Sequence, residues 1–319
     1  MSWASAGAFH HHLAMLLRSG LTMAQALEHA GGTTSGRHAR LARRWSTGCG
    51  RGERLAPQME RDGEEPLAVA VVTAGEASGR LPELCQDLST LYDHRRTLRA
   101  LFLGKLIYPV ILVHVAMLGG GLVRWFQTGA VGALLLPPAI LWGALGLAGV
   151  AFALAHRAGL TARWALLPGV RTLSSPLIAG NTCLVLRAGI LAGMLYHQAL
   201  ELAAGACGNR VVAADLRRIA GDLASGRTPD LCTALGNARF PRAVLQLVQT
   251  GETAGTLDET LGRAATLQRE SFRERTLWAT RLAAGTCYAA AMGFAAWTIL
   301  DLGRGYVEQI NAMGRELEG

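Results

Sequence analysis

Long runs of apolar residues without a charge are the main feature of the pattern along the chain. Three of them begin at Leu106, Ala130 and Ala283. An α-helix rises about 1.5 Å per residue, so about 18 residues cover about 27 Å of a hydrocarbon core of about 30 Å. We therefore predict transmembrane helices at 106–123, 130–155 and 283–302. The alternative is a set of core helices in a large soluble protein, but such helices rarely need so long a run without a charge.

The segments beside these runs have the apolar spacing of amphipathic helices. Leu13, Leu16, Leu17 and Leu21 follow a helical period, and glycines interrupt the pattern where turns are expected. Over the whole chain 50% of the residues are hydrophobic and 17% are charged, which argues against a disordered or wholly soluble protein. The predicted fold class is all-α: an integral membrane protein with two repeated cytoplasmic helical bundles and three transmembrane helices.

The net charge of +8 is unevenly distributed and orients the chain. Residues 1–105 contain 13 basic and 10 acidic residues, whereas residues 156–281 contain 15 and 9. Basic residues crowd the ends of the apolar runs, and the positive-inside rule then places both polar segments in the cytoplasm. We predict cytoplasmic bundles at 1–105 and 156–282, a cytoplasmic N-terminus, and a short periplasmic or external tail at 303–319.

The two polar segments resemble each other, and this repeat is the most informative feature of the sequence. The heptapeptide Gly-Glu-Ala-Ser-Gly-Arg-Leu at Gly75–Leu81 recurs as Gly-Glu-Thr-Ala-Gly-Thr-Leu at Gly251–Leu257, 176 positions later. Nearer the start of each segment, Leu-Arg-Ser-Gly at 17–20 matches Leu-Arg-Ala-Gly at 186–189 with an offset of 169. The order of the matches is preserved while the offset drifts, as loop insertions would cause. We therefore predict that one helical module occurs twice.

The glycines of the shared motif are expected to end one helix in a tight turn, after which a new helix begins. In the first copy the new helix runs from Pro82 through Leu98 toward the apolar run at Leu106. In the second copy it runs through Leu261 toward the run at Ala283. We predict that the last helix of each bundle is continuous, or nearly so, with a transmembrane helix.

This pattern resembles the type II secretion F family, which includes the inner-membrane platform proteins of type II secretion (GspF-like) and of type IV pilus assembly (PilC-like). The family signature is G-E-x-S-G-x-L, followed by a long helix that ends in a basic residue and a Tyr-Pro pair at the membrane. The residues that carry the resemblance are Gly75, Glu76, Ser78, Gly79, Leu81, Lys105, Tyr108 and Pro109 in the first copy and Gly251, Glu252, Gly255 and Leu257 in the second. The second copy departs from the signature because it has Ala254 in place of serine and lacks the Tyr-Pro pair.

The resemblance covers essentially the whole chain and implies a function. Such a protein is a multi-pass platform in the bacterial inner membrane and couples a separate hexameric assembly ATPase to the polymerisation of pilin or pseudopilin subunits. The implied partners are that ATPase, pilin or pseudopilin subunits, other inner-membrane assembly proteins, membrane lipid and further copies of the chain. Relatives usually carry an N-terminal extension that docks other components, and we expect that surface to be absent or replaced here. The resemblance does not decide whether the machine is a secretion, a pilus or a competence system.

The sequence indicates no chemistry of its own. It contains no G-x-x-x-x-G-K-[ST] phosphate loop, and its one Gly-Lys pair ends at Lys105. Consecutive residues of a helix point in different directions, so His10–His12 are better explained by an amphipathic face than by a metal site. For His114 and Asp301, a neutral histidine bonded to the backbone and an interfacial aspartate are favoured over a proton relay. We predict no catalytic, cofactor-binding or metal-binding residues and no enzymatic activity.

Several features allow two interpretations. Glu76 and Glu252 either lock the Gly-Glu turn by accepting amides or pairing with an arginine, which we favour, or contact a partner. The basic surface favours anionic lipid or an acidic partner over nucleic acid, because aromatic residues make up only 6% of the chain and fall mostly in or beside apolar segments. The alternative function is a small membrane transporter or membrane enzyme with duplicated cytoplasmic domains, but transporter repeats lie inside the membrane and carry polar sites at its midplane.

Overall fold

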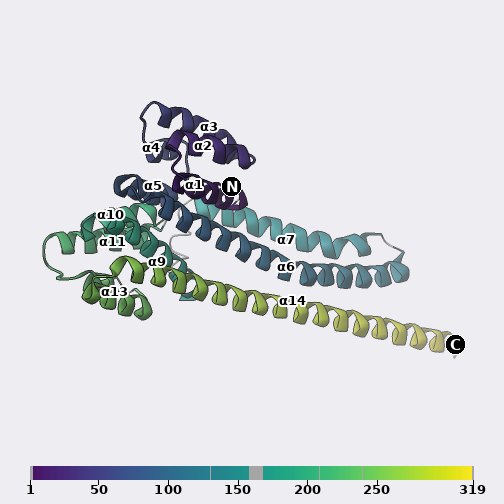
Figure 1. Ribbon diagram of the computed structural model, residues 1–319. Coiled ribbons are helices and arrows are strands. Elements are labelled where there is room, and N and C mark those ends of the chain that lie inside the picture. The colour runs from purple at the N-terminus through teal and green to yellow at the C-terminus, as the bar shows by residue number, and fades with distance from the viewer. Residues whose placement is uncertain (1–2, 130, 158–167, 208, 239, 318–319) are drawn as a thin grey trace. The chain divides into compact units, whose positions relative to one another are not determined.

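The computed structural model describes residues 3–129, 131–157, 168–207, 209–238 and 240–317, which form helices joined by turns and short connections (Figure 1). The helices are α1 (Trp3–Arg18), α2 (Met23–Thr33), α3 (Arg37–Gly50), α4 (Leu55–Arg61), α5 (Pro66–Ser78), α6 (Leu81–Thr128), α7 (Gly132–Arg157), α9 (Pro168–Leu191), α10 (Tyr196–Ala206), α11 (Arg210–Ala224), α12 (Leu231–Asn237), α13 (Arg242–Ala254) and α14 (Leu257–Leu317). No β-strand occurs in these described ranges. The predicted all-helical class is confirmed.

The chain divides into two compact units. The polar unit comprises Met1–Arg99 and Ala162–Glu274, and the apolar unit comprises Ala100–Thr161 and Arg275–Gly319. The sequence predicts separate bundles at 1–105 and 156–282, whereas the structure packs most of both segments into the single polar unit. Helix α5 of the first segment contacts α9 and α10 of the second, and these contacts join the two segments. A sequence repeat alone does not reveal such packing between its copies.

Within the polar unit, the first part of the chain (Met1–Arg99) and the second part (Ala162–Glu274) have the same order of helices. Helices α2 and α10 each contain 11 residues, α4 and α12 each contain 7, and α5 and α13 each contain 13. The first residues of α2 and α10 lie 173 positions apart, as do those of α3 and α11, and from α4 and α12 onward the separation is 176. The separation therefore changes from 173 to 176 between the start of the third helix and the start of the fourth helix of each part.

Aromatic side chains fill the core of the first part. Phe9, Trp45 and Tyr92 are each 1% exposed. The polar ends of the two larger rings are satisfied, because Trp45 Nε1 donates to Asp62 Oδ2 at 2.9 Å and the Tyr92 hydroxyl donates to Glu65 Oε2 at 3.2 Å. These bonds allow large aromatic rings to be buried without leaving a donor unpaired.

The last helix of each part is unusually long. Helix α6 contains 48 residues and α14 contains 61, and each begins at the shared motif and continues through an apolar run. Pro109 lies inside α6 and has no amide hydrogen, so the Lys105 carbonyl lacks its usual intrahelical donor, yet the helix continues. The predicted continuity with the apolar runs is confirmed. The predicted tail at 303–319 is helical as far as Leu317.

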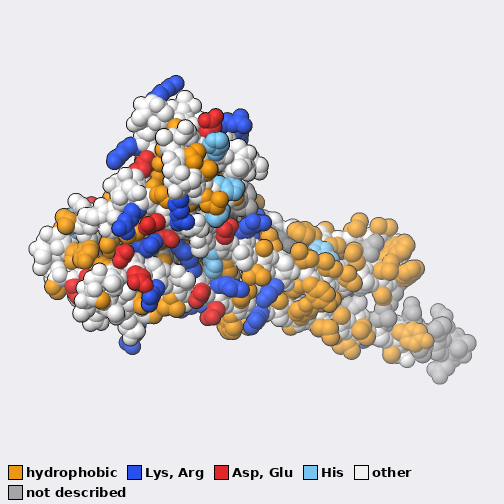
Figure 2. All heavy atoms as spheres, viewed as in Figure 1, with side chains coloured by type: hydrophobic (Ala, Val, Ile, Leu, Met, Phe, Trp, Pro, Cys, Tyr) orange, Lys and Arg blue, Asp and Glu red, His pale blue; other side chains and the backbone are white. Residues whose placement is uncertain are grey.

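Two of the described helices are long and apolar enough to cross a membrane. They are α6 over Leu81–Phe126 and α14 over Leu257–Val307, and only 12% and 6% of their most apolar stretches are buried inside the protein. Core helices of a soluble protein would be mostly buried, and Figure 2 shows hydrophobic side chains exposed along these segments. The third predicted span, 130–155, coincides with α7, but many side chains of α7 lie outside the described residues, so this span stays a prediction.

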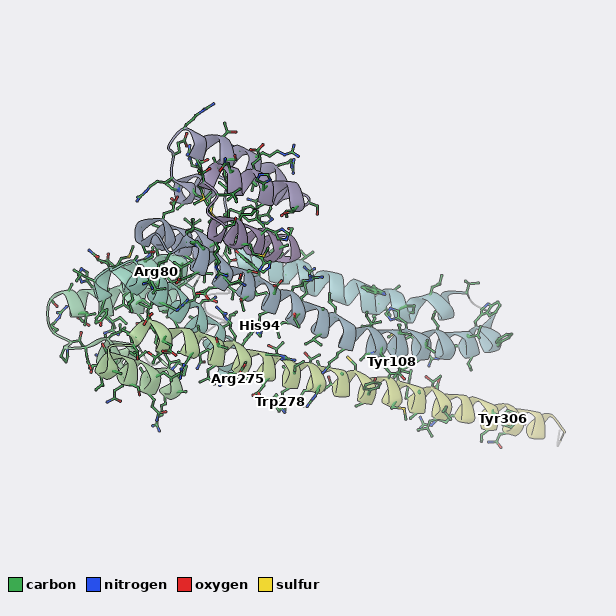
Figure 3. The ribbon with its side chains drawn as sticks, viewed as in Figure 1. Arg80, His94, Tyr108, Arg275, Trp278 and Tyr306 are labelled. Atoms are coloured by element: carbon green, nitrogen blue, oxygen red, sulfur yellow. The ribbon has the colours of Figure 1, made fainter. Side chains whose placement is uncertain are left out.

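Exposed aromatic residues flank the predicted span 283–302 on α14. Trp278 is 64% exposed and Tyr306 is 66% exposed (Figure 3). They lie 28 residues apart, which corresponds to about 42 Å of helix and matches a bilayer of about 40–45 Å including its headgroups. Tryptophan and tyrosine favour this interfacial position because one end of each ring system is polar.

A buried histidine lies in the first part of the polar unit. His10 is 2% exposed, its Nδ1 lies 2.8 Å from the Ala6 carbonyl oxygen, and its ring stacks on Tyr92. Burial lowers the pKa of His10 from 6.5 to about 4, and nearby His38 acts in the same direction, whereas Ala6, Glu64 and Glu65 oppose the change. By contrast, His12 Nδ1 faces Thr33 Oγ1 at 2.7 Å, so His10 and His12 of α1 point in different directions.

We expect the protein to lose stability as the pH falls from 6.5 to about 4. In this window the unfolded chain protonates His10 and the folded chain does not, so the free energy of unfolding falls by about 1.4 kcal/mol per pH unit for this one group. Replacing His10→Phe, which keeps the stacking on Tyr92, should flatten the dependence of the thermal midpoint on pH. The control His29→Gln, at an exposed position of α2, should leave it unchanged. An equal pH dependence in wild type and His10→Phe would contradict this assignment.

Candidate functional site

The shared motif forms the turn between α5 and α6 and the turn between α13 and α14. Gly79 caps the end of α5 with a φ of 69°, and Gly255 caps the end of α13 with a φ of 70°. Glycine enters this left-handed region without the steric penalty that a Cβ brings, so it ends both helices sharply. The chain can then reverse within a few residues and begin a long helix.

The first glycine of each motif allows the next helix to pack closely. A Cβ on Gly75 would lie 3.0 Å from the Cα of Leu81, and a Cβ on Gly251 would lie 3.0 Å from the Cα of Leu257. Both leucines are nearly buried, at 4% and 5% exposure. The motif glycine and leucine are therefore two sides of one contact, between the end of a short helix and the start of a long one.

The motif glutamates make the same pair of hydrogen bonds in both copies. Glu76 accepts from the first amides of α4, from Leu55 N to Oε1 at 2.6 Å and from Ala56 N to Oε2 at 3.2 Å. Glu252 accepts from the first two amides of α12 at 2.8 and 3.0 Å. The first amides of a helix have no intrahelical acceptor and carry its positive partial charge, so a carboxylate stabilises them. This is the structural role favoured by the sequence; a contact of these glutamates with a partner stays a prediction.

Ser78 strengthens the first turn. Its hydroxyl donates to the Ala74 carbonyl at 2.8 Å, and its oxygen accepts from the amide of Arg80 at 3.3 Å. The second copy has Ala254 at this position. Its turn is held by a backbone bond, in which the Thr256 amide donates to the Gly251 carbonyl at 3.0 Å. The serine is thus an added bond in one copy and is not required for the turn itself.

Each motif turn borders a surface hollow. The first has a volume of about 460 Å³ and is lined by Gly75, Glu76 and Gly79 together with residues of α1, α2 and α3, of the connection between α3 and α4, and of the start of α6. The second, of about 300 Å³, is lined by the equivalent residues of the second copy and by Arg80 of the first (Figure 3). The glutamate oxygens beside these hollows accept backbone amides and so act as caps of α4 and α12.

The remaining motif residues lie in the apolar unit and far along α6. Lys105 and Tyr108 are exposed, Pro109 is buried, and the Tyr108 ring lies 5.8 Å from the Tyr288 ring of α14. The 24 residues from Leu81 to Lys105 correspond to about 36 Å of helix. These three residues and the motif turn therefore belong to different units of the chain.

A histidine and a tryptophan link α6 to α7 within the apolar unit. His114 Nδ1 lies 2.7 Å from the Val110 carbonyl oxygen, and Trp142 Nε1 lies 2.9 Å from His114 Nε2. A carbonyl can only accept and an indole N–H can only donate, so the arrangement requires a neutral His114 with its hydrogen on Nδ1. The backbone bond agrees with the expectation for this residue; the tryptophan partner was not predicted.

An ion pair links α6 to α14 in the same unit. Arg124 Nη2 lies 2.7 Å from Asp301 Oδ2, and the guanidinium lies 4.9 Å from the centre of the Trp297 ring. Sequence reasoning placed Asp301 at the membrane interface but missed its partner. The sequence contains an indication of this ion pair, because Arg124 and Asp301 each end an apolar run of similar length. Pairing of the two charges lowers the cost of placing them beside lipid.

We expect Glu252→Gln to destabilise the polar unit by about 1–3 kcal/mol, because the amide side chain has one acceptor oxygen for two helix amides and has lost its charge. Glu76→Gln should have a similar effect, since the geometry is the same. The matched control is Glu60→Gln, at an exposed position of α4, which should change stability by no more than about 0.5 kcal/mol. Thermal unfolding of the solubilised full chain measures all three. Equal midpoints for Glu252→Gln and Glu60→Gln would show that the carboxylate does not act as a cap.

Comparison with known proteins agrees with this geometry. The family model described as "Type II secretion system (T2SS), protein F" matches residues 9–126 and again residues 183–300, and each match contains one motif turn and most of the long helix that follows it. A type II secretion system protein F from Xanthomonas campestris pv. campestris is 28% identical over 230 residues, covering 62% of this chain and 56% of that protein. A type 4 fimbrial assembly protein PilC from Pseudomonas putida is 27% identical over 294 residues, covering 82% and 73%. The chain thus spans about half the length of the first relative and about three quarters of the second.

The two family matches together cover most of the chain, including both copies of the Gly-Glu motif and most of both long helices. The chain belongs to the family of protein F of the type II secretion system (T2SS).

Proposed function

We propose that this protein is an inner-membrane platform of a type II secretion or type IV pilus-like assembly machine. It would couple a separate cytoplasmic assembly ATPase to the polymerisation of pilin or pseudopilin subunits. The observation that carries this proposal is the course of α6 and α14, which each run without a break from a motif turn into an apolar stretch suited to lipid. Membership of the family supports the same role.

The mechanism follows from helix mechanics. A displacement applied to the polar unit reaches the apolar stretch through hydrogen-bonded backbone, with no intervening loop to absorb it. The motif turns support the base of each long helix, since Glu76 and Glu252 tie the preceding helix to the start of α4 or α12. The interhelical bonds of His114 and Arg124 would then pass the movement on to α7 and α14. The protein acts in this proposal by transmitting force, and it catalyses no reaction.

The proposed topology follows the charge distribution. The polar unit lies in the cytoplasm, the N-terminus is cytoplasmic, and spans at 106–123, 130–155 and 283–302 lead to a periplasmic C-terminal end. The basic residues before and after these spans, and the exposed Trp278 and Tyr306 on α14, support this arrangement. Protease treatment of sealed inner-membrane vesicles of known orientation tests it.

The proposed partners follow from the two kinds of surface. The charged polar unit offers its surface to the ATPase, and the exposed apolar faces of α6 and α14 suit pilin-like transmembrane helices, other inner-membrane assembly proteins, lipid and further copies of the chain. The matching helix lengths and the matching glutamate bonds in the two parts support the proposal that the polar unit arose by duplication of one module.

Removal of the gene tests the function directly. Pilin-like subunits should remain as monomers in the inner membrane of the deletion strain, while the level of the ATPase is unchanged, and plasmid-borne wild-type chain should restore filaments or secretion. Normal assembly in the deletion strain would contradict the proposal. Substrate-dependent flux in vesicles that contain only this protein would instead favour a transporter.

A further inference from the structure

A groove of about 670 Å³ opens where the two parts of the polar unit meet. Helix α6 of the first part and helices α9, α13 and α14 of the second contribute its lining. Three arginines line it, and we consider first the two that lie deepest, Arg187 on α9 and Arg269 on α14. This groove is separate from the hollows beside the motif turns.

Arg187 crosses the groove to form an ion pair with Asp87 of α6. Its guanidinium lies against Gly262 of α14, where a Cβ would come within 3.2 Å of Arg187 Nε. The arginine is only 21% exposed and the carboxylate 31%. This pair engages Asp87, and the other two acidic residues of the lining, Glu259 and Glu270, are exposed.

Arg269 forms no ion pair with any of the residues that the structure describes. It is 8% exposed, and its Nε and Nη2 atoms are buried without a hydrogen-bond partner among those residues. Burial lowers the pKa of the His94 side chain on α6, and the positive charge of nearby Arg269 acts in the same direction. Leaving guanidinium donors buried and unpaired is costly, and one carboxylate shared between two guanidinium groups does not satisfy both.

The rim of the groove adds apolar surface. Leu267 of α14 is 39% exposed, and Leu184 and Leu247 complete the apolar part of the lining. The third arginine, Arg263, is exposed and paired with Glu259 one turn earlier on α14, so the Glu259 carboxylate is already engaged and does not supply the missing acceptor. A suitable occupant therefore brings an acceptor for Arg269 and an aliphatic side chain for the leucines.

We infer that this groove binds an acidic, partly apolar segment of another protein, with one Asp or Glu carboxylate bonded to Arg269. A carboxylate matches the planar fork of a guanidinium and supplies the acceptors that Arg269 lacks. A lipid headgroup is less suitable, because Arg269 precedes the predicted span at 283 by 14 residues, or about 21 Å of helix. The inference concerns recognition alone and holds whichever way force passes through the long helices.

Peptide binding to the solubilised full chain tests the inference. The probe is a fluorescent peptide of alternating leucine and glutamate, compared with the same peptide carrying glutamine in place of glutamate. We expect the glutamate peptide to bind at least about tenfold more tightly, and Arg269→Gln to remove about tenfold in affinity. Arg263→Gln, which removes the same charge at the exposed rim, should change the affinity by less than about threefold.

A second variant keeps the test decisive if Arg269→Gln does not fold. Leu267→Glu places a carboxylate at the rim without touching the buried guanidinium, and it should prevent binding of the glutamate peptide while leaving the helical content unchanged. Equal affinity for the two peptides, or undiminished binding to Leu267→Glu, would overturn the inference. Binding of inorganic phosphate at this groove without binding of the peptide would also overturn it, since it would indicate a small-anion site.

Discussion

A flexible Gly-Ser segment inserted between Arg99 and Lys105 is expected to abolish assembly and leave the protein in the membrane. Helix α6 runs unbroken through this position, and glycine and serine disfavour helix while offering a flexible backbone. Motion of the polar unit would then be absorbed in the insert. Filament number or secreted protein in a complemented deletion strain measures the loss, which we expect to be complete.

The matched control is an insert that keeps α6 helical. About two turns of alanine-rich sequence, roughly seven residues, lengthen the rod and rotate its end by only about 20°. This variant should retain more assembly than the Gly-Ser variant, with equal amounts of both in the membrane. Full assembly by the Gly-Ser variant would show that rigid coupling through α6 is not needed.

Replacing Gly251 by alanine is expected to lower stability by about 2–4 kcal/mol, which is large for the addition of one methyl group. The new Cβ would overlap Thr260 Oγ1 and lie 3.0 Å from the backbone of Leu257. Thr260 cannot move away without losing its bond to the Leu257 carbonyl, and the backbone has no flexible end. Gly75→Ala should cost less, because the atom nearest its Cβ is the flexible end of Leu81.

The control for both variants is Gly221→Ala in α11, where a Cβ would meet no atom within 4 Å. Alanine favours helix over glycine by up to about 1 kcal/mol, so this variant should be as stable as wild type or more stable. Thermal midpoints of the solubilised full chain give the ranking. If Gly251→Ala matched Gly221→Ala, the close approach of α13 and α14 would not be what requires glycine.

The sequence predicts those features that depend on local pattern. The apolar runs and the glycines of the motif are local, and they correctly predict the turns at Gly79 and Gly255 and the continuity of α6 and α14. The sequence also favours Glu76 as an acceptor of backbone amides, because a carboxylate beside a turn needs nearby hydrogen-bond donors. The structure shows this bond.

Features that depend on packing between distant segments were not predicted. The joining of the two bundles into one unit, and the ion pair of Asp87 with Arg187 across it, require knowledge of how the copies face each other. The bond between Trp142 and His114 depends in the same way on the rotation of two helices within the apolar unit. The sequence pattern predicts which face of each helix is apolar, but it does not predict which other helix packs against that face.

The central claim is that α6 is one continuous rod from the motif turn into the apolar run. Spin labels introduced with non-natural amino acids at Thr90 and Leu118, two exposed positions of α6, test it in the full chain in lipid. Their separation of 28 residues predicts a single narrow distribution of distances near about 42 Å. A broad distribution, or a second population at much shorter distance, would show a flexible joint between them and would contradict the account.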